Sequence, residues 1–575
     1  MNQEENAMII NTNEIRNGQI MVADVCIIGS GAAGIAIALQ FIGTSKRVVV
    51  LTGGKRRETL KNRSLYKGVV EPKGTHEDLR EKRRRAYGGS TLDWGGRCIP
   101  FDAIDFEKRD HVPFSGWPID YDEVAKHYPR AMALCKAGEF NFKAPTTFPN
   151  TPKEILTGLD NEDIHSNALE RWSTPVNFAK DYGKELAAAP NIKVLVNAHA
   201  TGIDTAERKS SVSAISARAG EKDFEVVAHH YVLAAGAIEN ARILLASKNG
   251  HHPNGIGNEK DVVGRYYMCH HDGFFGAVAP KDRKSILYDF ETDKDGVGCR
   301  RRWVITAKAQ RERKMGNAVM FLHSLHNDEK EQDPLFSLIS TVKWLRNFIT
   351  PRTGETRLAL WKNDKKMLLW HLKVVLSKIW GQLPQLIHLS GLRFKKRRLP
   401  FILKSVNSEQ LGLYFQTEQV PHPDSRITLA PDRVDAHGMP LAKVQMAFND
   451  MDVKTVVESY LLFKEQYLKN VEGEIHVDLK ALDQFVRDSF NNFSSGSHQM
   501  GTTRMAADDN FGVVNADCRV HGMENLYVAG ASVFPTGSHA NPTLTIVALA
   551  LRLAEHLIET DPVTRSKNQN QQVLS

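Results

Sequence analysis

The apolar residues of this chain gather in short runs, each followed by glycines or other small residues. The first run, ADVCIIGSGAAGIAIALQFI at 23–42, predicts a buried strand at 25–28, then a tight turn and a helix. Similar strand-rich runs lie at 47–51, 191–203, 229–247 and 525–535. The alternation of strands and helices favours an α/β protein whose main sheet is built from distant segments.

Three glycines in the first turn form the pattern GxGxxG. Gly29 permits the tight turn, Gly31 lets a pyrophosphate approach the backbone, and Gly34 lets the helix pack closely on the strand. The N-terminus of the helix would then face the phosphates of a dinucleotide. Because the pattern lies between a predicted strand and a predicted helix, it indicates a Rossmann-type nucleotide-binding unit.

The residue that ends the next predicted strand departs from the usual nucleotide-binding pattern. An acid is expected there to hold the ribose 2′-OH of an adenine nucleotide, and this chain has Thr52. The basic run Lys55–Arg57 follows, and a missing acid beside arginines is the usual hint of the 2′-phosphate of NADP. The fingerprint alone therefore leaves NADP, NAD and FAD open.

Length and composition are those of a globular protein with more than one core. The chain has 575 residues, with 42% apolar and 25% charged residues. Its six cysteines form no CxxC pair, which argues against a zinc site or a disulfide framework and fits a reducing compartment. The N-terminal residues resemble no signal peptide, and no apolar run approaches the length of a membrane span. We therefore expect a cytoplasmic protein.

Positive charge is concentrated in one block. The chain carries a net charge of +8, but residues 343–404 hold fifteen Lys or Arg against two acids, a net of +13, which leaves −5 for the remainder. The stretch 365–380 is expected to form a helix with one apolar face, made of Leu368, Leu372, Val375, Leu376 and Ile379. With its tryptophans, the block is typical of a helix that contacts a membrane peripherally. A helix packed on its own domain or on another subunit is the alternative, and no nucleic-acid-binding module is recognised.

Several ordered motifs resemble the glucose–methanol–choline (GMC) family of FAD-dependent oxidoreductases, most of all its pyranose oxidase and sugar dehydrogenase branch. These motifs are the fingerprint at 24–54, RRAYGGSTLDWGGRC at 84–98, GWPIDYDEVAKHY at 116–128, VLAAGAIENARILLAS at 232–247, VVGRYYMCHHDG at 262–273, PDSRITLAPDRVDAHGMP at 423–440 and the block from 495 onwards. Residues 276–420 contain no such motif. The resemblance implies FAD as the cofactor. Thr52 departs from the glutamate that the family normally has there, and Glu58 is a candidate to replace it. Lys55–Arg57 is then expected to be a solvated loop.

The resemblance also implies an architecture. We expect a Rossmann-type FAD-binding domain assembled from discontinuous segments, and an α+β substrate domain with an antiparallel sheet. The expected division is an N-terminal tail at 1–20, FAD-binding segments at 21–115, 186–275 and 495–560, a connecting segment at 116–185, a substrate-binding domain at 276–494 with the basic insertion 334–404, and a disordered tail at 561–575.

The family's catalytic pair maps onto His498, in SHQMGT, and Asn541, in HANPTLT. Alcohol oxidation needs a base for the O–H proton, and a histidine has a suitable pKa. The resemblance makes His498 this base and flavin N5 the hydride acceptor, while the Asn541 amide orients the substrate oxygen. His539 is expected behind the pair. Asn541 is also expected to cap the final helix, with Pro542 in its first turn.

The residues expected to hold FAD lie in the glycine-rich turns of these motifs. They are Gly29, Gly31, Ala32, Ala33, Gly34, Thr52, Gly53, Gly89, Ser90, Trp94, Gly95, Gly96, Ala200, Ala235, Gly236, Gly530, Ala531, Asn541, Pro542 and Thr543. Some members of the family have a histidine before the tryptophan that bonds covalently to the flavin. This chain has Asp93 there, which implies dissociable FAD. No metal site is expected, because the adjacent histidine pairs lie in different predicted contexts.

The expected function is oxidation of a CH–OH group, most of all of a sugar or glycoside. Three alternatives stay open: a steroid or lipid-linked alcohol at a membrane surface, a non-redox lyase on the same fold, and a membrane-associated partner protein whose flavin is structural. The sequence does not indicate whether O₂ or another acceptor reoxidises the flavin, nor whether the chain forms a homo-oligomer.

Overall fold

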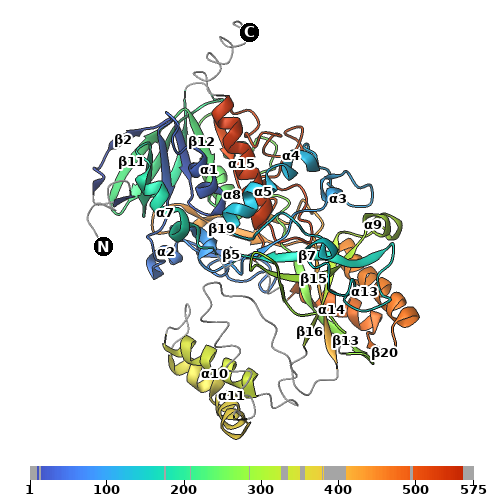
Figure 1. Cartoon of the computed structure of the whole chain (residues 1–575). Helices are drawn as coiled ribbons and strands as arrows, with labels where there is room; N and C mark the ends of the chain where they lie inside the picture. Colours follow the sequence, from blue (N-terminus) through green and yellow to red (C-terminus); the bar gives the residue numbers. More distant parts are fainter. Residues whose placement is uncertain are drawn as a thin grey trace.

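The computed structural model describes residues 9–11, 14–173, 176–206, 209–283, 285–324, 334–349, 357–378, 380, 410–491 and 497–560. Two large sheets organise these residues. In Figure 1 one lies at the upper left and the other at the lower right.

The first large sheet is parallel throughout. Its six strands run in the order β1 (Ile9–Asn11), β8 (Ile192–Val196), β4 (Val48–Thr52), β3 (Val25–Ile28), β12 (His230–Leu233) and β21 (Leu526–Val528). Strands β3 and β4 are buried along their whole length, which explains why their sequences are continuous apolar runs without alternation. The predicted Rossmann-type sheet of distant segments is confirmed.

Helices cover this sheet and bury their apolar residues in doing so. Helix α1 (Ala32–Gln40) packs against α7 (Phe178–Ala188) and α15 (Thr543–Glu559), and α15 also packs against α4 (Tyr121–Ala125) and α5 (Tyr128–Cys135). Beside them lies a four-stranded sheet. Its order is β2 (Gln19–Val22), β11 (Lys222–Val227), β10 (Val212–Ala219) and β9 (His199–Thr205).

The described residues among the first twenty, in the segment expected to be an N-terminal tail, include parts of two strands. Strand β1 pairs with β8 in parallel, and β2, which begins at Gln19, pairs with β11. An edge strand needs only main-chain hydrogen bonds from its neighbour, so a short polar-flanked segment joins a sheet without a strong apolar pattern.

The second large sheet is antiparallel at every pairing and has eight strands. Its order is β20 (Gly473–His476), β13 (His271–Pro280), β17 (Leu411–Thr417), β16 (Ala318–Ser324), β15 (Gly298–Ile305), β7 (Ile164–Trp172) and β6 (Arg97–Cys98), with β14 (Glu291–Thr292) on β15. Helix α13 (Asp450–Asn470) packs on β16 and β17, and α14 (Leu479–Asn491) packs on α13. The expected α+β part with an antiparallel sheet is thereby confirmed.

Smaller elements connect the two sheets. A three-stranded sheet of β18 (Arg426–Val434), β19 (Pro440–Gln445) and β5 (Gly68–Val70) packs on α8 (Ala237–Ala246). The remaining short helices are α2 (Leu60–Ser64), α3 (Ala103–Phe106), α6 (Ala144–Thr147) and α9 (Ala307–Arg313), with 3-10 turns at Gly89–Leu92 and Ala531–Val533. Strands β6 and β7 bring parts of 21–115 and 116–185 into the antiparallel sheet. The domain limits given above therefore stay a prediction.

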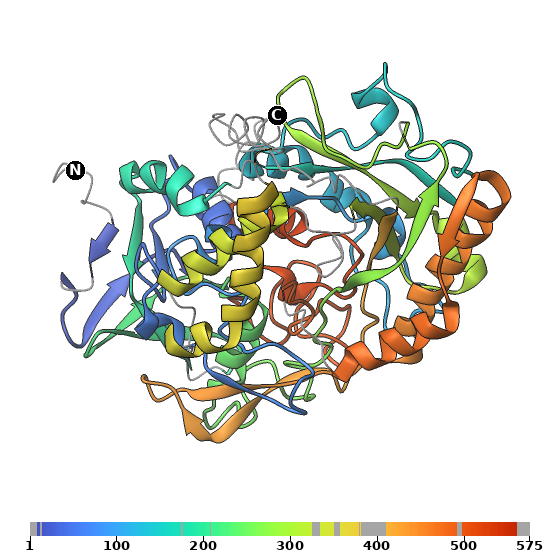
Figure 2. The ribbon, with the colours of Figure 1, turned by 90° about the horizontal axis from the view of Figure 1, so that it is seen from below.

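The basic insertion contains a helical hairpin of α10 (Pro334–Ile349) and α11 (Arg357–Lys378). Figure 1 shows it in yellow, projecting from the body, and Figure 2, seen from below, shows it in front of the body. The two helices pack on each other through buried residues that include Leu368, His371 and Val374, and the His371 ring lies 3.1 Å from the Ser337 hydroxyl.

The apolar face predicted for this segment is only partly correct. Leu368 is buried and Val375 half-buried, but Leu372 and Leu376 are exposed, the latter by 77%. The reason is that the buried positions of α11 follow one another every three residues, so that His371 and Val374 are buried after Leu368. Ile379 lies outside the described residues, as do 381–409.

Candidate active site

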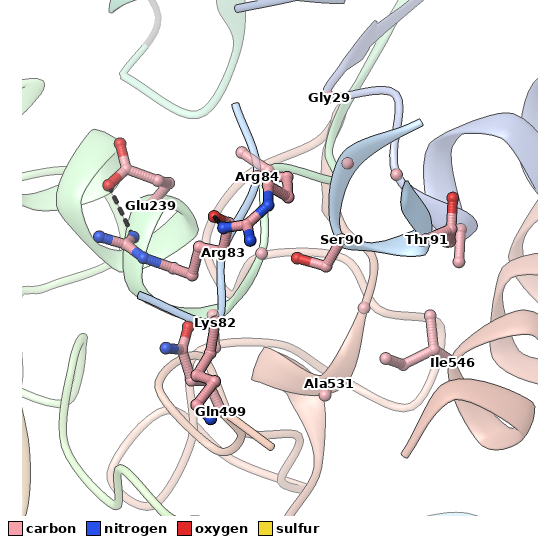
Figure 3. Close-up of a pocket in the computed structure, with 18 of the residues that line it drawn as sticks. Gly29, Lys82, Arg83, Arg84, Ser90, Thr91, Glu239, Gln499, Ala531 and Ile546 are labelled. Carbon is pink, nitrogen blue, oxygen red and sulfur yellow. Dashed lines mark hydrogen bonds and ion pairs between the residues drawn. The ribbon is translucent and has the colours of Figure 1, made fainter. Parts of the chain in front are cut away.

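A cavity of about 1070 Å³ lies where the two large sheets approach each other. One part of it follows the carboxyl ends of β3, β4 and β12, which is where open parallel sheets bind nucleotides. The other part reaches residues of the antiparallel sheet. Figure 3 shows the nucleotide-side part, with Gly29, Ser90 and Ala531 around it.

The glycine turn after β3 is shaped for a close approach. Gly29 has φ +115°, and a Cβ there would lie 2.3 Å from the Ala234 carbonyl oxygen. At Gly34 a Cβ would lie 2.0 Å from the Gly29 oxygen, so only glycine lets α1 pack this closely on the turn. A Cβ at Gly31 would meet nothing within 4 Å, because it would point into open space at the cavity wall. The turn thus leaves a cradle at Gly31 for a ligand.

Most of the residues predicted to bind the cofactor line this cavity. They are Gly29, Gly31, Ala32, Ala33, Thr52, Gly53, Gly89, Ser90, Trp94, Gly95, Ala200, Ala235, Gly236, Gly530, Ala531, Asn541, Pro542 and Thr543. Gly34 and Gly96 do not line it. Gly34 packs behind the turn, and Gly96, at φ +82°, packs against the Ser173 backbone. The two glycines are needed for packing, a requirement that a motif does not distinguish from ligand contact.

Three helices begin at the cavity without a side-chain cap. Gly31 precedes α1, Gly236 precedes α8 and Pro542 precedes α15, and none of the three provides a side chain that accepts from the first-turn N–H groups. These free N–H groups suit the phosphates and the electron-rich ring of a flavin dinucleotide. The expected cap at Asn541 is wrong by one position, because the Asn541 side chain is engaged elsewhere.

The end of the cavity near β4 is the candidate site for the adenosine. The Thr52 hydroxyl accepts a hydrogen bond from Ser30 at 2.6 Å, which leaves its own O–H free for a ribose oxygen. Lys55–Arg57 are exposed and do not line the cavity. Glu58 does not replace the missing acid, because its carboxylate accepts from the Arg85 backbone N–H at 2.7 Å.

An arginine that the sequence analysis missed lies at this end instead. The Arg85 guanidinium contacts the Glu239 carboxylate at 3.4 Å, and Arg83 and Arg242 contact the same carboxylate at 3.1 and 3.2 Å. Figure 3 shows the Arg83–Glu239 pair. Although burial disfavours its charge, the three arginines lower the pKa of Glu239 to about 2.

The loop at 88–96 borders the middle of the cavity. Gly89 and Ser90 form its 3-10 turn, and the Trp94 indole N–H donates to the Val176 carbonyl at 2.7 Å. Asp93 lines the cavity and is ion-paired with Arg84.

His498 and Asn541 meet at the cavity wall, although 43 residues separate them in the sequence. The Asn541 amide donates to Nε2 of His498 at 3.0 Å, and both side chains line the cavity. Burial, then the neighbouring His270, lowers the pKa of His498 well below its usual value. The ring is therefore neutral near pH 7, as a proton acceptor must be.

His539 lies behind this pair and does not line the cavity. It is fully buried, 3.1 Å from an Arg302 nitrogen and 3.3 Å from the Asp102 carboxylate. This is where the sequence analysis expected it.

A polar wall from the antiparallel sheet completes the cavity, and the sequence analysis missed all of it. The residues are Arg97 on β6, Trp172 on β7, Asp272 on β13, and Tyr414 and Gln416 on β17. The Tyr414 hydroxyl bonds Asp272, and Arg97 donates to the Gln416 side-chain oxygen at 2.8 Å. The sequence gives little signal for such a wall, because single polar residues on separate strands form no motif.

No group of three or more His, Cys, Asp or Glu among the described residues is arranged to hold a metal ion. In the same residues, no helix is both long and apolar enough to span a membrane.

Comparison with known proteins identifies the family. GMC oxidoreductase family models match residues 122–271 and 421–550. The chain is similar to the 6'''-hydroxyparomomycin C oxidase of Streptomyces lividus, with 23% identity over 93% of this chain and 92% of that protein. It is also similar to the fructose dehydrogenase large subunit of Gluconobacter japonicus, with 21% identity over 94% of this chain and 99% of that subunit.

A solved structure has the same fold. Pyridoxine 4-oxidase from Mesorbium loti superposes with a TM-score of 0.51 at 14% identity, covering 94% of this chain and 99% of that one. The glycine cradle, the uncapped helix ends and the long two-part cavity fit a flavin dinucleotide. The chain belongs to the GMC oxidoreductase family, and it is an oxidoreductase for which this membership implies FAD as the cofactor.

Proposed function

We propose that the enzyme oxidises a CH–OH group of a sugar or glycoside, and that FAD bound in the cavity accepts the hydride. The observation that carries this proposal is the His498–Asn541 pair. A proton acceptor and an N–H donor lie 3.0 Å apart, on the wall of the cavity that also contains the glycine cradle.

This pair is complementary to an alcohol group. Nε2 of His498 accepts the hydroxyl proton, and the Asn541 amide donates to the hydroxyl oxygen. The two side chains bond each other at 3.0 Å, so an alcohol that binds both exchanges one hydrogen bond for two. Removal of the O–H proton by His498 leaves negative charge on the oxygen, which the Asn541 N–H stabilises.

The polar wall supports a polyhydroxylated substrate. Asp272 accepts hydrogen bonds from hydroxyl groups, and Arg97, whose terminal Nη2 has no partner among the described residues, donates them. Trp172 offers an apolar ring surface for the C–H face of a sugar. A steroid would need a largely apolar pocket instead. By their names, the two relatives act on an aminoglycoside and on fructose.

Anaerobic mixing of the enzyme with a panel of sugars, glycosides and sterols tests the proposal. A sugar or glycoside should bleach the flavin absorbance at a rate that saturates with its concentration. Bleaching by a sterol alone would overturn the substrate class. Consumption of a substrate without any bleaching would overturn the oxidation itself and favour a lyase.

We also propose that FAD is dissociable. The position before Trp94 holds Asp93, whose carboxylate is ion-paired with Arg84 and lacks a ring nitrogen that could bond the flavin. Acid or heat should therefore release the yellow colour into the supernatant. Flavin that remains with the precipitated polypeptide would contradict this.

A second proposal concerns the basic insertion: we propose that the hairpin contacts an anionic membrane surface from the cytoplasmic side. Exposed apolar residues follow one stripe of α11 and its end at a spacing of three or four residues, namely Leu369, Leu372, Leu376 and Trp380. Exposed lysines flank this stripe, and residues 343–404 carry a net charge of +13. This charge opposes pairing of two copies and suits anionic lipid headgroups. The six unpaired, buried cysteines agree with a reducing compartment.

A further inference from the structure

We propose that His270 is a positioning residue that holds His498 in the tautomer whose Nε2 lone pair faces the cavity. The inference rests on the proposed function, because it concerns how the proposed base is prepared. His270 lies directly before β13, is fully buried, and contacts His498 ring to ring.

One chain of hydrogen bonds begins at a backbone carbonyl. The Gly537 oxygen can only accept, and it lies 3.2 Å from Nε2 of His270, so this nitrogen carries the proton. A neutral imidazole has one N–H, which makes Nδ1 of His270 an acceptor. Nδ1 of His498 lies 2.8 Å away and must then be the donor. Nε2 of His498 is left with its lone pair.

A second chain begins at a guanidinium and reaches the same result. Arg97 can only donate, so the oxygen of the Gln416 amide points to it at 2.8 Å. The Gln416 nitrogen consequently donates one N–H to the His539 carbonyl at 2.5 Å, and its other N–H is shared between Oδ1 of Asn541 at 3.4 Å and Nδ1 of His270 at 3.3 Å. The nitrogen of Asn541 therefore faces Nε2 of His498, which must accept.

The opposite tautomer would break both chains. With its proton on Nε2, His498 would direct an N–H against the Asn541 amide N–H, and two lone pairs would face each other 2.8 Å apart between the rings. Because a buried polar group that loses its hydrogen bond is unfavourable, the network selects one tautomer.

The network also accommodates the product of proton transfer. Protonated His498 keeps donating from Nδ1 to a neutral acceptor, so the ring of His270 adds no positive charge to those of Arg97 and Lys82, which also act on His498. Burial lowers the pKa of His270 to about 4, with Asp272 opposing this shift and His539 and Arg97 adding to it. His270 is therefore neutral near pH 7.

The backbone fixes the distance between the two rings. Met268 and Met500 exchange main-chain hydrogen bonds of 3.0 and 2.9 Å, two residues before His270 and two after His498. The acceptor is thus held in register with the proposed base by a bridge between two distant segments.

Two substitutions at His270 distinguish the effect of its hydrogen-bond acceptor, Nδ1, from the effect of its aromatic ring. His270→Phe keeps the ring and removes the acceptor, whereas in His270→Asn the oxygen on Cγ takes the place of Nδ1. The Gln416 N–H that already donates to this point, at 3.3 Å, favours oxygen there. We expect flavin reduction in His270→Phe to slow by about 10- to 1000-fold, below the limit of about 10⁴ for complete loss of a base. Substrate affinity should change by less than about threefold, and His270→Asn should recover to within about tenfold of the wild type.

The control is the adjacent residue. His271 is equally buried but bonds the Ser489 hydroxyl at 2.9 Å, on the other side of the strand. His271→Phe should reduce the flavin at close to the wild-type rate. An equal loss in His270→Phe and His271→Phe, or no recovery in His270→Asn, would overturn the inference.

Nitrogen NMR of the histidine-labelled wild-type holoenzyme tests the tautomer without any change at His270. With His498→Ala used to assign the signals, we expect a protonated Nδ1 and an unprotonated Nε2 for His498. The reverse would overturn the inference. A wild-type reduction rate in His498→Ala would instead overturn the role of His498 in the proposed function, which keeps the two failures distinct.

Discussion

Glu239 neutralises a cluster of arginines near the adenosine end of the cavity. Its carboxylate contacts three buried or half-buried guanidinium groups, those of Arg83, Arg85 and Arg242. Glu239→Gln would leave these positive charges without their shared partner in a region of low dielectric. Because Arg242 retains Asp435 at 2.7 Å, we expect a loss at the lower end of the range of about 3–5 kcal/mol in the free energy of unfolding.

Urea denaturation with excess FAD at pH 7 measures this loss. The matched control is Glu472→Gln, which removes a carboxylate that is paired with Lys281 on the exposed surface. This change should stay within about 0.5 kcal/mol of the wild type. Equal effects of the two substitutions would contradict the special position of Glu239.

The same carboxylate gives a pH dependence with a defined sign. Its pKa is about 2 in the folded protein against an ordinary 4.5, so the folded state favours the charged form. The stabilisation is fully present above the ordinary pKa and is lost as the pH falls from about 4.5 through about 2. The difference in stability between wild type and Glu239→Gln should therefore be constant above pH 5 and shrink below it. A constant difference down to pH 3 would argue against the shifted pKa.

The proposed catalytic pair predicts two unequal losses. His498→Ala removes the base and should slow flavin reduction by about 10²–10⁴-fold, with FAD retained because the glycine cradle at Gly29–Gly34 does not include this side chain. Asn541→Ala removes one orienting hydrogen bond and should cost less. Stopped-flow absorbance of the reductive half-reaction measures both.

His556→Ala, at the far end of α15, is the control for the same helix and should leave the reduction rate unchanged. If His498→Ala slowed reoxidation of the flavin and not its reduction, the proposed role of His498 as the base of the reductive half-reaction would be contradicted.

At the scale of elements, the turn after β3 contains one glycine that we expect to be needed for folding, Gly34, and one that we expect to be needed for FAD binding, Gly31. A Cβ at Gly34 would lie 2.0 Å from a backbone oxygen, so Gly34→Ala must push α1 away from the turn. We expect it to destabilise even the FAD-free protein, by about 1–3 kcal/mol. A Cβ at Gly31 meets nothing within 4 Å but points into the cavity. Gly31→Ala should leave the unfolding of the FAD-free protein unchanged and weaken FAD binding.

Thermal unfolding without FAD and fluorescence titration with FAD measure the two effects independently. Normal FAD affinity in Gly31→Ala would contradict the assignment of this turn to the cofactor.

The sequence predicted those elements that depend on near neighbours. The strand, turn and helix at 25–40 follow from an apolar run and three glycines, and the pairing of His498 with Asn541 follows from family motifs. The polar wall of the cavity was not predictable, because antiparallel pairing between distant strands brings its residues together. These residues are Arg97, Trp172, Asp272, Tyr414 and Gln416. The packing face of α11 was mispredicted because His371 takes a buried position that the apolar pattern assigns to leucines.

At the scale of the whole molecule, the hairpin α10–α11 predicts binding to vesicles. It is inserted between β16 and β17, two paired strands of the antiparallel sheet. The enzyme should sediment with vesicles that contain anionic phosphatidylserine, at least about tenfold better than with neutral phosphatidylcholine. Salt should weaken this binding, because the basic residues act through screened charges.

The combined change Leu369→Ser and Leu376→Ser should abolish vesicle binding and leave flavin reduction intact. Leu468→Ser, an equally exposed leucine on α13, is the control and should bind like the wild type. Binding that ignores lipid charge, or survives the double change, would contradict a membrane surface and point to an acidic macromolecule as the partner.

The order of the strands in the parallel sheet has a consequence for how the protein is made. Strand β12 ends at residue 233, and its outer neighbour β21 ends at residue 528, so β12 lacks that neighbour while 528 − 233 = 295 residues are made. At a synthesis rate of about 5–20 residues per second, this takes roughly 15–60 s. During that time the nascent chain exposes an open sheet edge and lacks α15, so it has no complete place for the flavin. The site for the flavin is therefore incomplete until β21 and α15 have both been synthesised, so the cofactor is acquired late in the making of the chain.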